Sequence, residues 1–136
     1  MNRYVLDTNV VIRFLRDDHP TMSRAAAALF QESARGKVEL HLETTILAEA
    51  VFVLTRFYKQ SRADVADALR DLITGCRLKM PGQDVALNAL NRFKQHTVDF
   101  PDTLAVAVAA SENIPVASFD RDFDKFTDIR RFEPKV

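Results

Sequence analysis

The sequence predicts an α/β fold with a central, mostly parallel sheet flanked by helices. Short runs of strand-forming residues alternate along the chain with longer segments in which apolar residues recur at helical spacing. Strands that are separated by helices usually pair in parallel and are covered by those helices. Because no Gly-, Ser- or Pro-rich linker, repeat or low-complexity segment interrupts the chain, we expect one domain over residues 1–136.

The first part of the chain supplies two strands and two helices. Residues 4–6 form a short apolar strand that leads directly into a helix over residues 8–16. An alanine-rich helix over residues 22–34 stops at Gly36, and residues 38–42 then alternate between apolar and polar side chains. That alternation is typical of a half-buried strand.

Four helices and two short strands complete the expected fold. In chain order these are helices over about residues 45–58, 61–75, 83–95 and 99–113, a buried strand over residues 116–119 and an edge strand over residues 130–132. A capping box from Ser61 to Asp64 opens the second of these helices. Pro101 fits the first turn of the fourth, where its missing N–H is harmless, and Pro115 ends that helix.

Composition excludes several classes of protein. Lys plus Arg and Asp plus Glu both number 19, so the formal net charge is zero and any polyanion site must be a local patch. Two groups are candidates for such a patch, and equally for an ordinary solvated face: Arg13 with Arg16, and Arg56 with Lys59 and Arg62. The single Cys76 excludes an internal disulfide and a cysteine zinc cluster. Without a signal-peptide core or a long apolar run, the chain is expected to be soluble and cytoplasmic.

Common nucleotide and hydrolase motifs are absent. The three glycines, Gly36, Gly75 and Gly82, are spaced too far apart for G-x-G-x-x-G or a P-loop. No serine lies in G-x-S-x-G, and the three histidines lack the spacing of a metal site. The acids are therefore the remaining candidates for chemistry.

Four carboxylates occupy places where an α/β sheet binds ligands. They are Asp7 after the first strand, Glu49 in the third helix, Asp102 at the start of the sixth and Asp120 after the strand over residues 116–119. Carboxyl ends of parallel strands share one edge of a sheet, so these acids are expected to converge. Unit charges about 5 Å apart repel by about 3 kcal/mol at an effective dielectric of ~20, so the set needs protons or a divalent cation. An all-oxygen site suits Mg²⁺ or Mn²⁺.

Each acid also has a structural explanation. Asp7 and Asp102 both fit helix capping, because each lies at the start of a helix. Asp120 fits a solvated turn, as does its neighbour Asp122. Glu49 differs, because the surrounding helical residues are apolar, which favours a buried or cleft-facing carboxylate.

Four short segments contain these acids. They are LDTNVVI at residues 6–12, LAEA at residues 47–50, DFPDTLAVAVA at residues 99–109 and SFDRDFDKF at residues 118–126. In combination and order they resemble the PIN-domain nucleases, and among them the VapC-like toxins of bacterial and archaeal toxin–antitoxin pairs. The resemblance extends over essentially the whole chain.

The resemblance implies a role for each matching residue. The implied metal ligands are Asp7, Glu49, Asp102 and Asp120. Asp122 is the reserve candidate for the fourth acid. Asn9 and Ser118 take the polar places beside the ligands, and Ser118 stands where the family usually has threonine. Thr8 and Asn9 are expected to fix the Asp7 carboxylate by hydrogen bonds.

The resemblance also implies an activity. It predicts a three-layer α/β fold and an endoribonuclease that hydrolyses RNA phosphodiesters with Mg²⁺ or Mn²⁺. It further predicts a homodimer and inhibition by a cognate antitoxin protein, for which the helix over residues 22–34 and residues 51–58 offer apolar surface. The alternative is a catalytically silent PIN-like module that binds RNA or a protein partner.

Two other acidic α/β classes fit less well. An aspartyl phosphatase needs a second Asp two residues after the first to act as general acid, and that position is Asn9, which has no titrating proton. A receiver domain needs a phospho-accepting Asp at the end of a middle strand, whereas the strand over residues 38–42 is followed by Glu43.

Overall fold

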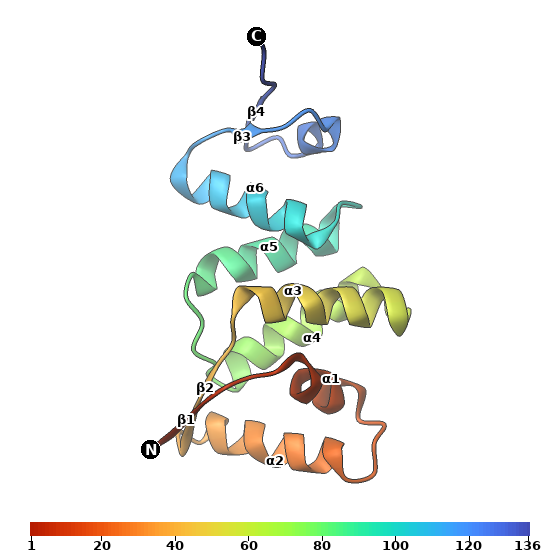
Figure 1. Cartoon of the computed structure of the whole chain (residues 1–136), viewed down its shortest axis with the longest axis vertical. Coiled ribbons are helices and arrows are strands. Elements are labelled where there is room, and N and C mark those ends of the chain that lie inside the picture. The colour runs from red at the N-terminus through yellow and green to blue at the C-terminus, as the bar shows by residue number, and fades with distance from the viewer. The chain divides into compact units, whose positions relative to one another are not determined.

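The computed structural model describes residues 1–136, which fall into two units. Unit 1 covers Met1–Gln83 and unit 2 covers Asp84–Val136. Each unit contains one pair of short parallel strands together with helices (Figure 1). The α/β class and the parallel pairing expected from the sequence are therefore confirmed.

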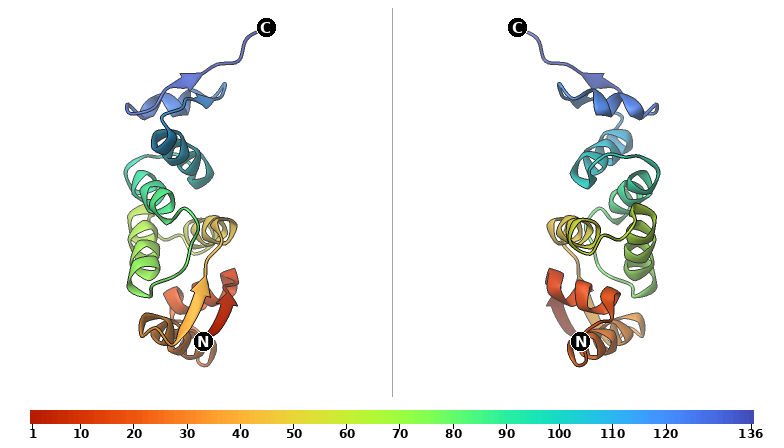
Figure 2. Two further views of the ribbon diagram at one scale, coloured as in Figure 1. Left: turned by 90° about the vertical axis from the view of Figure 1, so that its left-hand side faces the viewer. Right: turned by 90° about the vertical axis from the view of Figure 1, so that its right-hand side faces the viewer.

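Unit 1 begins with its strand pair. β1 (Asn2–Val5) lies beside β2 (Val38–His41) and pairs with it in parallel (Figure 2). The N–H of Leu6 donates to the carbonyl of His41 at 2.9 Å, so the ladder reaches the residue before Asp7. Side chains of β2 alternate between buried and half-buried, as the sequence predicts, whereas β1 is exposed along its length.

Two helices of unit 1 lie between β1 and β2 in the sequence. α1 (Thr8–Arg16) and α2 (Met22–Ala34) have the bounds expected from the sequence, and they pack against each other. The rings of Phe14 and Phe30 meet between them, with centroids 4.9 Å apart. α1 ends at Asp17, which adopts the left-handed conformation with φ 49°.

The third helix changes form part-way along. α3 covers Thr44–Phe52 and continues as a π-helical turn, η1 (Val53–Phe57), where the sequence predicted an uninterrupted α-helix. The N–H of Tyr58 donates to the carbonyl of Val53, five residues back, at 3.1 Å. A π turn holds more residues than an α turn, so the side chains at its end are rotated relative to a continuous α-helix.

α4 (Arg62–Gly75) follows η1 in unit 1. The hydroxyl of Ser61 accepts a hydrogen bond from the N–H of Asp64 at 3.1 Å, which confirms the predicted N-terminal cap. A cap of this kind stabilises a helix by about 1 kcal/mol. Leu69 and Ile73 on this helix are completely buried and belong to the core.

Unit 2 consists of two helices followed by two short strands. In chain order its elements are α5 (Gln83–Gln95), α6 (Phe100–Glu112), β3 (Val116–Ala117), the 3₁₀ turn η2 (Arg121–Lys125) and β4 (Arg131–Phe132). β3 and β4 pair in parallel. A cluster of Val98, Val106, Phe123 and Phe126 forms a core, in which η2 is anchored against α6.

A bidentate ion pair connects α5 to the segment before β4. Arg92 Nη1 donates to Asp128 Oδ1 at 2.9 Å, and Nη2 donates to the second carboxylate oxygen. The hydrogen bond with Arg92 lowers the pKa of the Asp128 carboxyl. The Arg92 guanidinium also lies 5.8 Å from the centre of the Phe126 ring, so this pair borders the core of unit 2.

The strand expected to be buried over residues 116–119 is shorter and more exposed than predicted. β3 ends at Ala117, and the side chain of Phe119 is 71% exposed. The reason is local, because the hydroxyl of Ser118 accepts a hydrogen bond from the N–H of Asp120 at 2.9 Å. Side-chain bonds of this kind compete with strand pairing and turn the chain.

Candidate functional site

Unit 1 brings two of the predicted acids into one recess. Asp7 and Glu49, which are far apart in the sequence, both line a depression of about 500 Å³. The other lining residues are Thr8, Asn9, Ile12, Arg13, Phe52, Val53, Phe57 and Tyr58. The recess is therefore formed by the start of α1, the end of α3 and the π-helical turn η1.

Asp7 occupies the N-cap position of α1 without capping it. Its backbone is extended, with φ −89° and ψ 152°, but its side chain makes no capping hydrogen bond. An Asp that served mainly as a cap would bond to a backbone N–H in the first turn of the helix. The carboxylate is exposed instead, and it is available to a ligand in the recess.

Glu49 faces the recess and is not buried. Its neighbours Ala50 and Val51 are buried in the core, whereas Glu49 itself is exposed on the other side of α3. Of the two environments expected from the apolar sequence around it, the cleft-facing one is therefore found.

Thr8 departs from the expected role. Its side chain is only 6% exposed, and its hydroxyl has no hydrogen-bond partner. The expectation that this hydroxyl fixes the Asp7 carboxylate is wrong, because no such bond forms. A buried hydroxyl without a partner costs about 1–3 kcal/mol, so Thr8 is a local destabilising feature at the start of α1.

The aromatic side chains of the recess were not predicted as part of the site. Phe52 and Phe57 are 63% and 74% exposed, and both line it. The ring of Phe57 packs edge-on against Tyr58 at 4.9 Å, and the guanidinium of Arg16 lies 4.4 Å from the centre of the Tyr58 ring. The available signal was that Phe52 and Phe57 fall off the buried face of the helix.

Asp102 is a candidate acid of unit 2 whose pKa is raised by its surroundings. It lies half-buried in the first turn of α6. Burial raises the pKa of its carboxyl, and the neighbouring charges of Asp99, Asp120 and Asp122 raise it further. The acids of the two motifs DFPD and SFDRDFDKF thus lie within electrostatic reach of one another, as the sequence predicted.

Asp120 and Ser118 are linked through the backbone. The carboxylate of Asp120 accepts a hydrogen bond from the N–H of Asp122 at 2.8 Å, which caps η2. Because Ser118 in turn holds the N–H of Asp120, its hydroxyl positions the loop that carries this acid. The side chain of Asp122 is 3.4 Å from the ammonium group of Lys125. The turn expected here is therefore present, and Asp120 retains a second carboxylate oxygen.

The donor set in both units suits a hard divalent cation. All candidate ligands are carboxylates. Burial raises the pKa of Asp102, and so do the negative charges of its acidic neighbours, which a bound cation would offset. Within either unit, no three Asp, Glu, His or Cys side chains gather closely enough to hold a metal ion. Each unit by itself therefore offers an incomplete ligand set.

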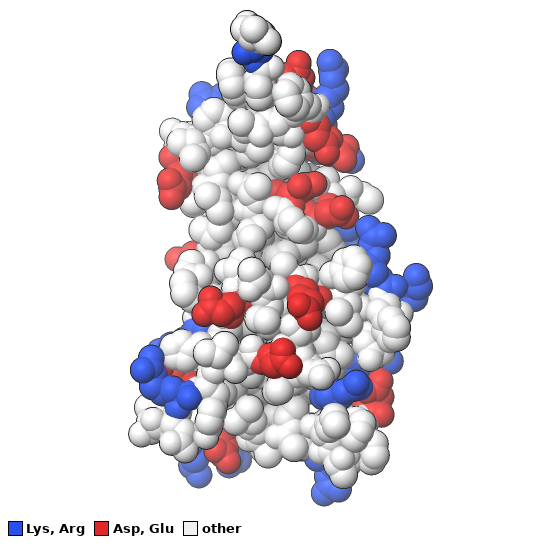
Figure 3. All heavy atoms as spheres, viewed as in Figure 1, with Lys and Arg blue, Asp and Glu red and all other residues white.

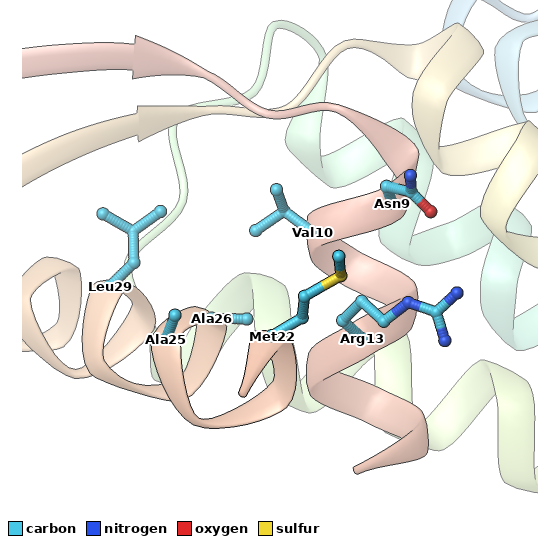
Figure 4. Close-up of a pocket in the computed structure, with 7 residues that line it drawn as sticks. All are labelled: Asn9, Val10, Arg13, Met22, Ala25, Ala26 and Leu29. Atoms are coloured by element: carbon cyan, nitrogen blue, oxygen red, sulfur yellow. The ribbon is translucent and has the colours of Figure 1, made fainter. Parts of the chain in front are cut away.

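A second recess lies between α1 and α2. It measures about 300 Å³ and is lined mainly by apolar side chains from Val10, Met22 and Leu29 and the alanines near them (Figure 4). Asn9 and Arg13 border both recesses, and in Figure 4 their polar ends point away from α2. Because no acid lines this recess, the chemistry is expected in the first one.

The basic side chains of one face can be followed in Figure 3. On this face Lys and Arg form separate groups and no continuous stripe. The formal net charge of the chain is zero.

An α/β chain with parallel strands, acids after strand ends and an oxygen-only donor set has the character of a metal-dependent nuclease. The family comparison gives the same class: the model of the PIN domain matches residues 4–129, across both units. The chain belongs to the PIN domain family. No curated protein matches it.

Membership of this family supports part of the activity expected from the sequence. PIN domains are nuclease-type modules that bind nucleic acid and hydrolyse phosphodiester bonds, generally with divalent metal ions. No helix of the structure combines the length and apolar character needed to cross a membrane.

Proposed function

We propose that this protein is an endoribonuclease that depends on Mg²⁺ or Mn²⁺ and that residues 1–136 act as a single PIN domain. The observation that carries the proposal is the meeting of Asp7 and Glu49 in one recess of a chain whose PIN match extends over residues 4–129. Asp102 and Asp120 supply further carboxylates at the positions where the family motifs recur.

In this proposal the four acids hold the metal and the side chains beside them keep the acids in place. Asp7, Glu49, Asp102 and Asp120 are the proposed ligands. A bound divalent ion would lower the pKa of its water and neutralise charge on the phosphodiester. Ser118 positions Asp120 through the backbone, and Asn9 offers hydrogen bonds within the recess.

The direct test is cleavage of labelled RNA by the purified full chain in Mg²⁺, in Mn²⁺ and in EDTA. We expect Asp7→Asn and Asp102→Asn to abolish cleavage, because each removes a charged ligand. Asp71→Asn in unit 1 and Glu112→Gln in unit 2 are matched controls, since both residues are exposed and line no acidic recess. Cleavage that persists in EDTA would overturn the mechanism, and cleavage retained in both ligand variants would overturn the assignment of ligands.

We propose further that the nuclease is the toxin of a toxin–antitoxin pair and forms a homodimer. The proposal rests on the likeness of the motifs to VapC-like toxins and on apolar side chains left exposed on α2 and at the end of α3, including Met22 and Phe52. Induced expression is expected to arrest growth of a bacterial host, and Asp7→Asn is expected to be harmless. Light scattering of the purified chain tests the dimer, and a monomer at working concentration would contradict it.

The second candidate is a PIN module that binds RNA or a partner without cutting. The incomplete ligand set within each unit favours it. RNA binding by the wild-type chain, with no cleavage in either metal, would support this candidate over the nuclease.

A further inference from the structure

We propose that Phe57 forms a base-stacking subsite beside the acidic recess, so that an unpaired base next to the cleaved phosphodiester stacks on this ring. The inference rests on the proposed function, because it takes the metal held by the carboxylates as the place where the phosphodiester binds. The subsite is carried by the placement of one exposed ring, by its support and by the polar residues around it.

The π-helical turn places Phe57 at the recess. In a continuous α-helix Phe57 would lie well away from Glu49 around the helix axis. Because η1 advances less per residue than an α-helix, Phe57 stays close to the face that carries Glu49. Both residues line the recess. Single π turns inside α-helices are frequently found at functional sites, which fits this placement.

The ring is supported and at the same time open. Phe57 is 74% exposed although it packs edge-on against Tyr58, with an interplanar angle of 80°. Tyr58 is itself held by the guanidinium of Arg16, 4.4 Å from its ring centre. A ring that is supported by a neighbour and still largely open to solvent suits a nucleobase, which stacks on any flat aromatic surface regardless of sequence.

The lining residues favour RNA over an apolar protein segment. The recess holds two carboxylates, an amide from Asn9 and the partly exposed guanidinium of Arg13. Arg13 Nη1 is only loosely paired, 3.6 Å from Asp18. A phosphate could therefore use Arg13 while a neighbouring base covers Phe57, whereas a purely apolar partner would leave these polar groups unsatisfied.

The test measures binding in Ca²⁺, a divalent cation that carboxylates also bind, with a short fluorescent oligoribonucleotide of mixed sequence, and a gel checks that the probe stays intact. A second probe has the same backbone with abasic positions, and a third is the matching duplex. We expect the wild-type chain to bind the intact single strand most tightly. Phe57→Leu keeps an apolar side chain but removes the ring, and it is expected to weaken binding by about fivefold to a hundredfold.

Three comparisons make the result specific to stacking. Phe57→Leu should have little effect on the abasic probe, Phe57→Trp should restore binding of the intact probe, and Phe132→Leu, which alters an exposed ring in unit 2, should bind like the wild type. Circular dichroism of each variant checks that the fold is retained.

Several outcomes would overturn the subsite. These are equal binding of single strand and duplex, wild-type affinity in Phe57→Leu, or an equal loss on the intact and abasic probes. If Phe57→Leu binds RNA normally but Phe57→Asp disrupts self-association in light scattering, the surface is a protein contact and stacking is wrong. Metal-dependent cleavage without base-dependent binding refutes only the subsite, whereas base-dependent binding without cleavage refutes only the proposed nuclease.

Discussion

The two acidic groups of this protein differ in what surrounds them. In unit 1, Asp7 and Glu49 line a recess whose other walls are largely apolar and aromatic. In unit 2, Asp102 lies near Asp99, Asp120 and Asp122, and burial together with their charge raises its pKa. The acidic group of unit 1 is therefore distinguished by the shape and apolar surface around it, and that of unit 2 by a concentration of negative charge. We therefore expect the two acidic groups to respond differently to substitution.

The largest effect is expected from the core that anchors the acids of unit 2. Phe123 is 6% exposed and lies between Asp122 and Asp124 in η2. Phe123→Ala should lower the free energy of unfolding by about 3–5 kcal/mol, because it leaves a cavity in the cluster with Val106. Denaturation in urea measures this loss. A loss below about 1 kcal/mol would show that η2 is not anchored as described.

Ser118→Ala tests how the acidic loop is positioned. Removal of the hydroxyl leaves the N–H of Asp120 without its partner, so we expect cleavage to fall about tenfold to a hundredfold, as for other groups that orient metal ligands. Ser118→Thr keeps the hydroxyl and should retain most of the activity. The rate constant kcat in Mg²⁺ is the measurement, and equal rates for both variants would remove Ser118 from the account.

Thr8→Val examines the recess of unit 1 in the opposite way. The hydroxyl is buried without a partner, so its replacement by a methyl group should stabilise the fold by about 1 kcal/mol. At the same time the affinity for Mn²⁺ or RNA should change little, because the buried hydroxyl does not reach the surface of the recess. A variant that is less stable than the wild type would show that the hydroxyl is satisfied in solution.

The smallest effect concerns pH and lies away from both acidic groups. Because Arg92 lowers the pKa of Asp128, this pair stabilises the fold above the ordinary carboxyl pKa of about 4, and the stability is lost as pH falls through the lower folded value. Asp128 is half-exposed, so Asp128→Asn should cost no more than about 1 kcal/mol at neutral pH.

The difference between Asp128→Asn and the wild type should shrink as the pH approaches 3. Urea denaturation at both pH values measures it, with Asp71→Asn as the control. A difference that grows in acid would contradict the sign of the shift.

Much of the secondary structure was predictable because it is encoded locally. The helices Met22–Ala34 and Gln83–Gln95 have the expected bounds. Gly36 marks the end of the first, and the Pro81-Gly82 pair marks the start of the second. The π turn at Val53–Phe57 was not predictable, because an apolar pattern of helical spacing does not reveal which backbone hydrogen bonds are made. The early end of β3 is linked to one side-chain hydrogen bond, which the Ser118 hydroxyl accepts from the N–H of Asp120.

The candidate site was predictable in composition and less so in its surroundings. The sequence indicated Asp7 and Glu49 from their positions, and the recess brings them together. It could not decide whether Asp7 capped its helix, because capping depends on a rotamer. Nor did it assign Phe57 to the recess, because that placement follows from the π turn.

We propose that carboxylates from both units, Asp7 and Asp102 among them, serve one metal-dependent activity. The most direct measurement is Mn²⁺ binding by calorimetry for the wild-type chain, Asp7→Asn, Asp102→Asn and the double variant. We predict that each single variant weakens binding at least tenfold and that the double variant is little worse than either one, because the ligands act as a unit. Wild-type Mn²⁺ affinity in either single variant would contradict the account.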